Sequence, residues 1–459
     1  MNRATAHPHP LLVPAIAASQ FAPPFMISGV AVALPALGTD LAAGATALSL
    51  VETVFLAAGV ALLLPAGRLG DASDKATLYK LGMVAFALSS LAAGLVSSMP
   101  AILTLRFVQG VASAAVQAAG PAIIADAVPP ERRGRAYGIT IGSIYAGLTL
   151  GPICAGFLVD LWGWRAVFLA GGALVLALLV PIHFMLTATW RRPPRGAVHL
   201  PSTLLAVVAM LALVGGAATL REGAIGYAAM VLGLALLAAF VFWQRRLAQP
   251  LLNVELLMKN IVLRGALLVQ WLLYCNAFGT VFLLSLYMQT VLGHSANTAG
   301  EVLAIGTLLM ALIAPFAGIL ADRRAPAFIA SCGVGVALLA ALLATRLGAD
   351  SPLLPVGLVL AVQGLGFAFF SSPNMKMVMN AVPPNRSSIA SALSATARSL
   401  GMVSGMLIVG ALISLSLGHD PVGADPARYV ATMHTSFWIL AAITALALAI
   451  SLLSRREEP

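Results

Sequence analysis

Charged residues are scarce in this sequence: Asp, Glu, Lys and Arg make up 9% of the 459 residues, whereas hydrophobic residues make up 60%. A soluble domain typically carries about 25% charged residues, so this composition excludes an ordinary soluble protein. The mean hydropathy of +0.97 indicates a chain that lies largely in hydrocarbon.

Cysteine is also rare, with three residues in the whole chain: Cys154, Cys275 and Cys332. They lie far apart in apolar stretches, which gives neither a disulfide framework nor the spacing of metal ligands. We therefore expect no metal and no cofactor.

Catalytic motifs are absent from the sequence. It contains no Gly-x-x-x-x-Gly-Lys-Ser/Thr phosphate loop, no His-Glu-x-x-His motif and no soluble segment large enough to hydrolyse ATP. His183 is alone within an apolar run, and the other histidines lie in tails or near run ends. The chain is not expected to be an enzyme, and any transport must draw on an ion gradient or on the gradient of its substrate.

Long apolar runs dominate what is present. A helix needs about 20 apolar residues to cross a bilayer, and the runs stay apolar on every face, unlike the alternating strands of a barrel. The sequence predicts an all-α membrane protein with fourteen spans, near residues 11–37, 47–66, 78–97, 101–125, 136–158, 166–188, 200–219, 225–243, 264–289, 297–320, 326–345, 353–379, 388–415 and 434–453.

The net charge of +10 is distributed in a way that predicts topology rather than nucleic-acid binding. With the N-terminus in the cytoplasm, 20 of the 26 basic residues fall on the inner side, and Arg106 and Arg398 remain inside the bilayer. We expect a multi-pass protein of the bacterial inner membrane, with both termini cytoplasmic. Its partners are lipid, a small-molecule substrate and protons, with no nucleic acid, and the protein is expected to be monomeric.

An internal repeat defines the domain organisation. Val128-Pro129-Pro130 recurs as Val382-Pro383-Pro384, and Gln109-Gly110 recurs as Gln363-Gly364, both 254 residues later. The repeat predicts a six-helix bundle over 1–190, two inserted spans over 191–246 and a second six-helix bundle over 247–459. Membrane repeats of this kind place the substrate site between the halves, and rocking of the halves gives alternating access.

A polar stripe follows the fourth span. Arg106, Gln109, Ser113 and Gln117 fall at i, i+3, i+7 and i+11, so they share one helix face. A charge at membrane depth must face protein or water, which predicts a cavity face. The alternative is that Arg106 lies near the outer end of its span and extends to the interface.

Glu52 is the acid that most requires a partner. It lies about six residues into the second span from the same side as Arg106, so the two reach a similar depth at about 1.5 Å per residue. We interpret Glu52 as a coupling or substrate-binding carboxylate. The alternative is an interfacial residue.

Further polar residues in the spans are candidates for the same cavity. Glu301 is a second candidate acid, or a cap of its helix, and Arg398 is either a functional cation or a structural partner across the bundle. The remaining candidates are amides and aromatic residues, for which ordinary packing is the alternative: Gln270, Trp271, Tyr274, Asn276, Gln363 and Asn374.

Several motifs together resemble the major facilitator superfamily, and within it the 14-spanner drug:proton antiporters of the EmrB/QacA type. The resemblance covers nearly the whole chain. It is carried by segments in the family's order: Val32-Ala33-Leu34-Pro35, Gly67-Arg68-Leu69-Gly70-Asp71, Arg106-Phe107-Val108-Gln109-Gly110, Gly147 with Gly151-Pro152 and Gly156, Gly163-Trp164-Arg165, Gly318-Ile319-Leu320-Ala321-Asp322, and Thr396-Ala397-Arg398.

The resemblance implies proton-coupled efflux of drugs or small hydrophobic metabolites. Gly147, Gly151, Pro152 and Gly156 match the antiporter-like fifth helix, where the two glycines four residues apart also allow close backbone approach and the proline removes a helix hydrogen bond. The resemblance assigns Gly67, Asp71, Asp126 and Asp322 to a cytoplasmic gate, with solvated surface charge as the alternative for the three aspartates.

Two departures from the family pattern leave alternatives open. The multidrug members usually carry an acid in the first span where this chain has Met26, so either Glu52 or Glu301 replaces it, or the substrate is neutral or anionic. A carrier of small anionic metabolites is thus an alternative function, and a non-transporting membrane receptor or enzyme is a third. After Asp71, Ala72-Ser73-Asp74-Lys75-Ala76 replaces the usual run of Arg and Gly, which puts the latch in question.

Overall fold

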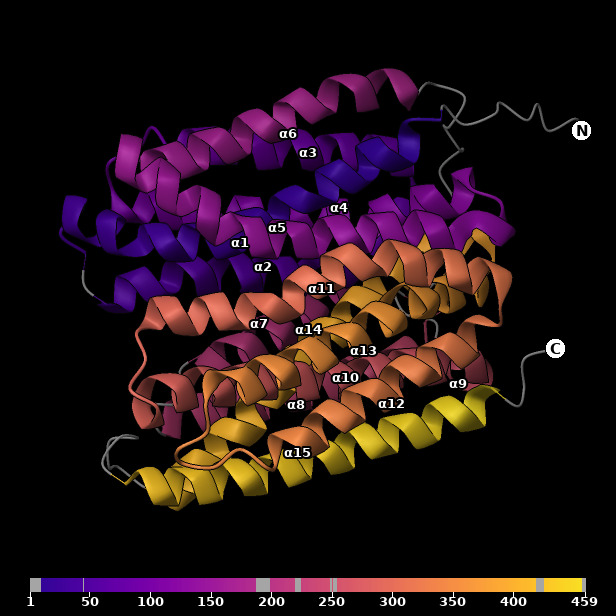
Figure 1. Ribbon diagram of the computed structural model, residues 1–459. Coiled ribbons are helices and arrows are strands. Elements are labelled where there is room, and N and C mark those ends of the chain that lie inside the picture. Colours follow the sequence, from indigo (N-terminus) through magenta and orange to yellow (C-terminus); the bar gives the residue numbers. More distant parts are fainter. Residues whose placement is uncertain are drawn as a thin grey trace, which may run out of the picture. The chain divides into compact units, whose positions relative to one another are not determined.

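Every secondary-structure element that the computed structural model describes is a helix (Figure 1). The structure describes residues 10–43, 45–186, 199–218, 224–247, 250, 254–417 and 425–455. The elements are α1 (Leu12–Asp40), α2 (Ala45–Ala72), α3 (Lys75–Ala93), α4 (Met99–Ala127), η1 (Pro130–Arg132), α5 (Arg133–Trp162), α6 (Arg165–Met185), α7 (Leu200–Ala218), α8 (Ala224–Gln244), α9 (Val254–Lys259), α10 (Ile261–Leu286), η4 (Tyr287–Val291), α11 (Ala296–Arg323), α12 (Pro326–Ala344), α13 (Leu353–Asn380), η5 (Pro384–Arg386), α14 (Ser387–Leu417) and α15 (Pro426–Arg455).

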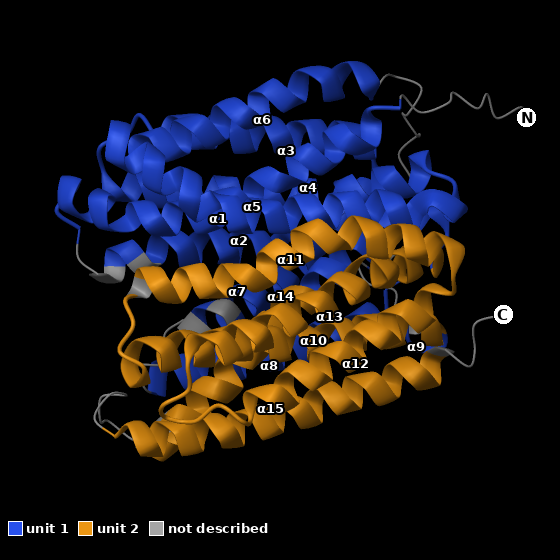
Figure 2. Ribbon diagram, in the orientation of Figure 1, with its two compact units in different colours: residues 1–259, 382–396 blue, residues 260–381, 397–459 orange. Residues whose placement is uncertain are grey.

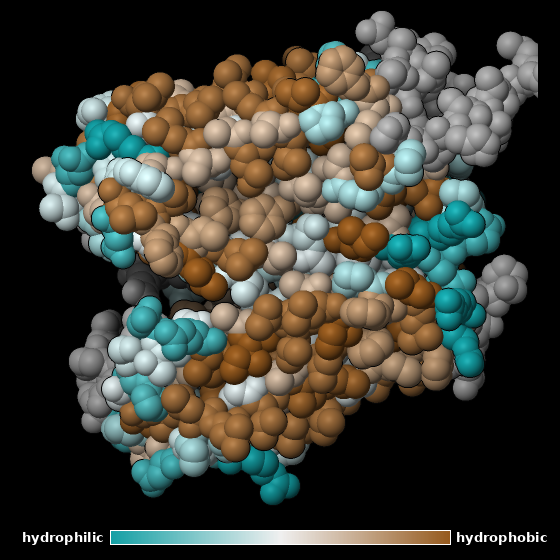
Figure 3. Space-filling view, turned by 45° about the horizontal axis from the view of Figure 1, so that its top comes forward, coloured by the Kyte–Doolittle hydropathy of each residue, from teal (hydrophilic) through white to brown (hydrophobic). Residues whose placement is uncertain are grey.

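Within the described residues, thirteen helices are long and apolar enough to cross a membrane. The expected seventh span, 200–219, corresponds to α7. It is not among the thirteen, because its apolar part, Leu200–Leu213, is shorter than the candidate spans. Large hydrophobic side chains such as Phe157, Phe184 and Phe316 are at least 70% exposed. Figure 3 shows hydrophobic residues over the flanks of the helices and hydrophilic residues gathered near helix ends, as a hydrocarbon surrounding requires.

The chain forms two compact units (Figure 2). Unit 1 comprises residues 1–259 and 382–396, and unit 2 comprises residues 260–381 and 397–459. Helix α14 belongs to both, because its first ten residues, 387–396, pack with unit 1 and the rest with unit 2.

In unit 1, α1 packs along α5 and α6, α2 packs along α4 and α7, and α3 packs along α4 and α6. The helices α7 and α8 form a hairpin whose Phe240 side chain is fully buried among Leu64, Ala206 and Ile389. The two inserted spans therefore pack with the first repeat. The expected boundary at residue 190 lies outside the described residues, and the boundaries of the repeats themselves stay a prediction.

In unit 2, α13 packs along α11 and α12, and α15 packs along α10 and α12. The core of this unit includes Tyr287, Tyr429 and Phe437, each fully buried. Tyr429 donates a hydrogen bond to the Leu283 carbonyl at 2.9 Å. Its buried hydroxyl group is therefore hydrogen-bonded despite the apolar surroundings.

The same close helix approach occurs in both units at repeat-related glycines. A Cβ added to Gly110 of α4 would lie 3.1 Å from the Gly59 nitrogen of α2, and one added to Gly364 of α13 would lie 2.5 Å from the Gly306 oxygen of α11. Backbones can approach this closely only where the side chain is absent. Gly110 and Gly364 thus share a close helix contact in their respective units, as their place in the predicted repeat suggests.

Candidate functional site

A buried charged group lies in unit 1, where α2 and α4 pack together. Glu52 and Arg106 are each the eighth residue of their helix, and the Arg106 Nη2 atom lies 3.3 Å from the Glu52 Oε1 atom. The Arg106 side chain is fully buried, whereas the Glu52 side chain is 20% exposed. The structure thus places the two charges together at one depth, with the carboxylate as the accessible member.

The Arg106 guanidinium has partners besides Glu52. It donates to the Val51 carbonyl at 2.9 Å and to the Gln109 Oε1 atom at 2.8 Å, and its Cζ atom lies 4.3 Å from the centre of the Phe55 ring. Gln109 in turn donates through Nε2 to the Ser90 hydroxyl. A fully desolvated cation is tolerated only when it is paired and hydrogen-bonded in this way.

Ser113 and Gln117 continue the α4 stripe but form a separate pair. Gln117 Nε2 donates to the Ser113 hydroxyl at 3.0 Å, and the Gln117 carbonyl accepts from Ser391 of α14 at 2.8 Å. The helix rise puts Ser113 about 10 Å along α4 from Arg106. The four stripe residues thus share a face of α4 and form two hydrogen-bonded pairs, Arg106 with Gln109 and Ser113 with Gln117.

Unit 2 brings together the predicted amide and aromatic residues of α10 and α13. Asn374 Nδ2 donates to Gln270 Oε1 at 3.1 Å, and the Tyr274 ring meets the Phe367 ring edge-on at 5.2 Å. These residues are at most 6% exposed. They form a mixed polar and aromatic contact between two apolar helices.

The other candidates of α10 have local partners. Trp271 donates through Nε1 to the Ser404 hydroxyl of α14 at 3.2 Å, and Thr280 donates to Asn276 Oδ1 at 3.3 Å. Gln363 of α13 is buried, and neither its Nε2 atom nor Asn276 Nδ2 has a hydrogen-bond partner within the described part of the chain.

Glu301 and Arg398 lie on helices other than those of the two groups above. Glu301 is exposed on α11, and Arg398 is half-buried on α14. Met26, at the family's usual position for an acid, is fully buried, and its sulfur occupies the space beside Gly171 of α6. This part of α1 is filled by apolar packing.

The α1–α5 contact explains part of the glycine motif. A Cβ on Gly147 would lie 2.5 Å from the Phe21 oxygen, and one on Gly151 would lie 2.8 Å from the Phe25 oxygen. The expected extension to Gly156 is not seen, because nothing lies within 4 Å of a Cβ added there. The next contact instead joins Gly29 and Ala155, at 3.3 Å from the added Cβ.

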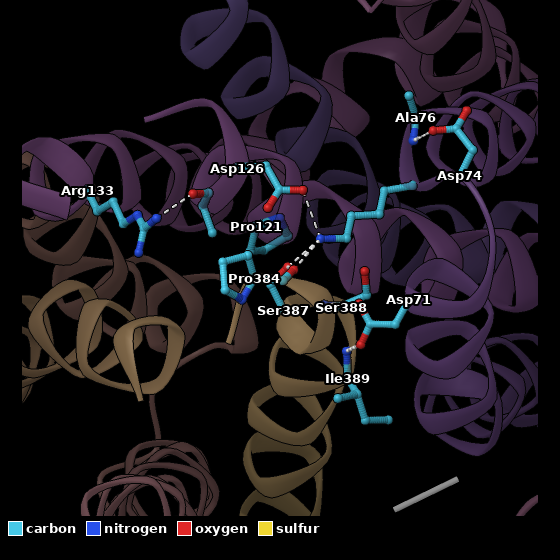
Figure 4. Close-up of polar contacts among 12 residues, drawn as sticks. Asp71, Asp74, Ala76, Pro121, Asp126, Arg133, Pro384, Ser387, Ser388 and Ile389 are labelled. Carbon is cyan, nitrogen blue, oxygen red and sulfur yellow. Dashed lines mark hydrogen bonds and ion pairs between the residues drawn. The ribbon is translucent and has the colours of Figure 1, made fainter. Parts of the chain in front are cut away.

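Asp71 and Gly67 meet the start of α14 within unit 1. The Asp71 carboxylate accepts from the backbone N–H groups of Ser388 and Ile389, each at 2.9 Å (Figure 4). A Cβ on Gly67 would lie 2.9 Å from the Ser388 oxygen. Asp71 thus satisfies N–H groups that a helix start leaves unpaired, and its charge complements the helix dipole.

Lys75 strengthens the same contact. Its Nζ atom donates to Asp126 of α4 at 2.8 Å, to the Ser387 hydroxyl at 2.5 Å and to the Pro384 carbonyl at 3.1 Å. Figure 4 shows Asp126 and Pro384 converging on this amine. We call Asp71, Lys75, Asp126 and the residues 384–389 that they bind the α14 clamp. The sequence put this latch in question because the usual run of Arg and Gly after Asp71 is missing. The contacts of the α14 clamp nevertheless form without that run.

Asp322, the predicted gate residue at the end of α11, has a different partner within unit 2. Its Oδ1 atom lies 2.7 Å from the Lys376 Nζ atom of α13, and Lys376 also donates to the Ala321 carbonyl at 3.0 Å. Both side chains are nearly buried, at 12% and 8% exposure. This ion pair ties the end of α11 to α13.

Sequence reasoning missed several residues of these groups. Ser90 could have been found as one of two adjacent serines inside an apolar span, and Lys75 as the first basic residue after the altered motif. The serines at the start of α14 carry no sequence signal, because their role comes from a contact between segments more than 300 residues apart.

The described helices and their buried, paired charges are those of a multi-pass integral membrane protein. The sequence model of the Major Facilitator Superfamily matches residues 16–255 and 266–459. The chain belongs to this superfamily of transporters, as expected from its motifs.

Relatives and solved structures agree with this assignment. The chain is 25% identical over 431 residues to the riboflavin transporter RibZ of Clostridioides difficile, covering 93% of each chain. It is 27% identical over 485 residues to the tetracenomycin C resistance and export protein of Streptomyces glaucescens, covering 94% of this chain and 88% of that one. The crystal structure of the human organic anion transporter MFSD10 shares the fold, with a TM-score of 0.65 at 15% identity over 96% of this chain and 98% of that one.

Proposed function

We propose that the chain is a secondary active transporter that exports drugs or small hydrophobic metabolites in exchange for protons, by alternating access. We place it in the 14-spanner drug:proton antiporter group, with α7 as the fourteenth span and both termini in the cytoplasm of a bacterial cell. The export proteins among its relatives support this direction of transport, since one confers tetracenomycin C resistance.

The observation that carries the proposal is the pair of Glu52 and Arg106. A proton carrier in a membrane needs a carboxylate that is accessible in at least one state and whose charge is balanced there. Glu52 is partly exposed, and Arg106 balances its charge. When Glu52 takes up a proton, Arg106 loses its counter-charge but keeps the Val51 carbonyl and Gln109 as hydrogen-bond acceptors.

The remaining groups have proposed roles around this pair. The amide and aromatic residues of α10 and α13, with Trp271, contact the substrate, and Arg398 and the α4 residues Ser113 and Gln117 line its path. The close α1–α5 contact at Gly147 and Gly151, with Pro152, limits leakage. Gly67 and Asp71 in the α14 clamp, and the Asp322–Lys376 pair, hold the cytoplasmic ends of their helices in one state.

The alternative of an anion carrier makes a different use of Arg106. Each of its three nitrogen atoms already donates to a protein acceptor. Because the Arg106 side chain is also fully buried, an anionic substrate would have to displace Glu52 to reach it, which favours the carboxylate as the group that exchanges its charge.

The test is transport in proteoliposomes with an imposed pH gradient, using riboflavin, tetracenomycin C, ethidium and a small organic acid as separate substrates. We expect gradient-driven transport of at least one uncharged or cationic compound by the wild type. Glu52→Gln should abolish the effect of the gradient, because the amide keeps the side-chain shape but cannot bind and release a proton.

Two matched substitutions serve as controls. Glu131→Gln changes an exposed glutamate of η1 and should leave transport unchanged, whereas Glu301→Gln tests the competing acid. Normal gradient-driven transport by Glu52→Gln at equal protein level would reject Glu52. Loss in Glu301→Gln alone would move the role there, and transport of the organic acid alone would favour the anion carrier.

A further inference from the structure

Gln363 occupies the position in the second predicted repeat that Gln109 occupies in the first. The residues that form hydrogen bonds with the Gln109 amide have no polar equivalents around Gln363. The two glutamines are 254 residues apart, and each precedes the glycine at which its helix closely approaches a neighbour, Gly110 or Gly364. Their backbone settings in the two units therefore correspond.

The hydrogen-bond partners do not correspond. Gln109 is bonded to Ser90 and Arg106, and the positions 254 residues after these are Ala344 and Leu360. Both are buried apolar residues of the unit 2 core. The Gln363 Nε2 atom accordingly has no partner among the residues that the structure describes, although the residue is only 5% exposed.

An unsatisfied buried amide destabilises a fold by about 1–3 kcal/mol. In unit 2, the positions that correspond to the partners of Gln109 are occupied by the apolar residues Ala344 and Leu360. An apolar side chain would therefore also fit this core at position 363. The stability of the fold therefore does not explain the amide at Gln363. A bound molecule could accept the hydrogen bonds that its N–H groups lack within the protein.

The surroundings of Gln363 indicate the chemistry of that molecule. Gln363, Phe367, Phe370 and Asn374 fall at i, i+4, i+7 and i+11 on one face of α13, and contacts of Phe367 with Tyr274 and of Asn374 with Gln270 turn this face towards α10. The face carries aromatic rings and amides and no charge. Lys376, the one charged residue of α13, is paired with Asp322.

We propose that Gln363 determines substrate specificity by donating a hydrogen bond to a carbonyl oxygen of an uncharged aromatic substrate, whose ring packs against Phe367 and Tyr274. The inference rests on the proposed transport function and gives it a substrate class. Aromatic rings bind planar molecules through their faces and edges, and a buried donor selects those that carry an acceptor at the matching position.

The test measures binding of lumiflavin, an uncharged tricyclic compound with carbonyl groups, and of the cation ethidium to the purified full-length protein by fluorescence. Gln363→Leu should weaken lumiflavin binding by about 10-fold or more, the worth of one buried hydrogen bond, and leave ethidium binding unchanged. The melting temperature should stay equal or rise, because an unpaired amide is removed. Gln363→Glu should also weaken lumiflavin binding, because a carboxylate accepts rather than donates.

The control is Ser331→Ala, which removes a buried hydroxyl bonded to Ser451 elsewhere in unit 2 and should leave lumiflavin binding unchanged. Wild-type affinity for lumiflavin in Gln363→Leu, or no lumiflavin binding by the wild type, would overturn the inference. Binding that depends on Gln363 in a protein without gradient-driven transport would retain it and reject the proton-coupled function instead.

Discussion

At the scale of single residues, the pairing of Glu52 with Arg106 follows from simple counting along two helices. Both are eighth in their helices, and α2 and α4 pack side by side, so equal depth was predictable from the sequence. The further partners of the group were not, because the Val51 carbonyl, which accepts from Arg106, and the Ser90 hydroxyl, which accepts from Gln109, depend on how the helices are rotated about their axes. Helix rotation is set by packing of the whole unit.

The planar guanidinium is expected to be necessary at position 106. Arg106→Lys keeps the charge but not the fork of donors, and one ammonium cannot reach Val51, Gln109 and Glu52 together. We expect transport to fall by about 10-fold or more and the melting temperature to drop. Arg346→Lys, at an exposed residue, is the matched control, and equal effects of the two changes would contradict the account.

At the scale of helices, the glycine motif was only partly readable from sequence. The spacing of Gly147 and Gly151 predicted a close contact, and the structure shows it against α1. Gly156 continues the motif in sequence but not in space, since five residues after Gly151 the chain has turned to another face of α5. The latch was judged from its missing Arg and Gly residues, yet Lys75 supplies a cation that binds both Asp126 and the segment before α14.

The two glycines give a sharp comparison within one helix. Gly147→Ala places a Cβ 2.5 Å from the Phe21 oxygen, so α1 and α5 must separate, and we expect a lower melting temperature and reduced transport. Gly156→Ala meets open space and should be neutral or stabilise the helix by up to about 1 kcal/mol. The melting temperatures of both variants test this prediction. Equal destabilisation by the two changes would show that close α1–α5 packing does not explain the glycines of α5.

At the scale of the whole molecule, the sequence predicted the repeat and the superfamily fold, because both depend on long apolar spans and on motifs at fixed offsets. It did not predict that the start of α14 packs with unit 1. That arrangement joins residues separated by more than 300 positions, through Asp71 and Lys75. Since α14 continues into unit 2, the clamp is well placed to influence transitions of the complete transporter.

Weakening the clamp should expose the start of α14. Asp71→Ala removes the acceptor of the Ser388 and Ile389 N–H groups, a change worth about 1–2 kcal/mol. In a cysteine-free background, a Ser391→Cys reporter, buried in the wild type, should react several-fold faster with a water-soluble maleimide.

Asp74→Ala is the control for this prediction, because Asp74 accepts hydrogen bonds from Ala76 and Thr77 and so caps α3 rather than α14. It should leave the reporter rate unchanged. A reporter that reacts equally fast in the wild type and in Asp71→Ala would show that the clamp does not hold α14.

The central claim is that Glu52 carries the proton, and comparing two transport modes of Glu52→Gln tests it most directly. Substrate exchange without a pH gradient requires only alternating access, whereas accumulation driven by the gradient also requires a proton site. We predict that Glu52→Gln in proteoliposomes retains exchange of labelled substrate and loses accumulation driven by the pH gradient. Accumulation at the wild-type level, with exchange intact, would contradict the claim.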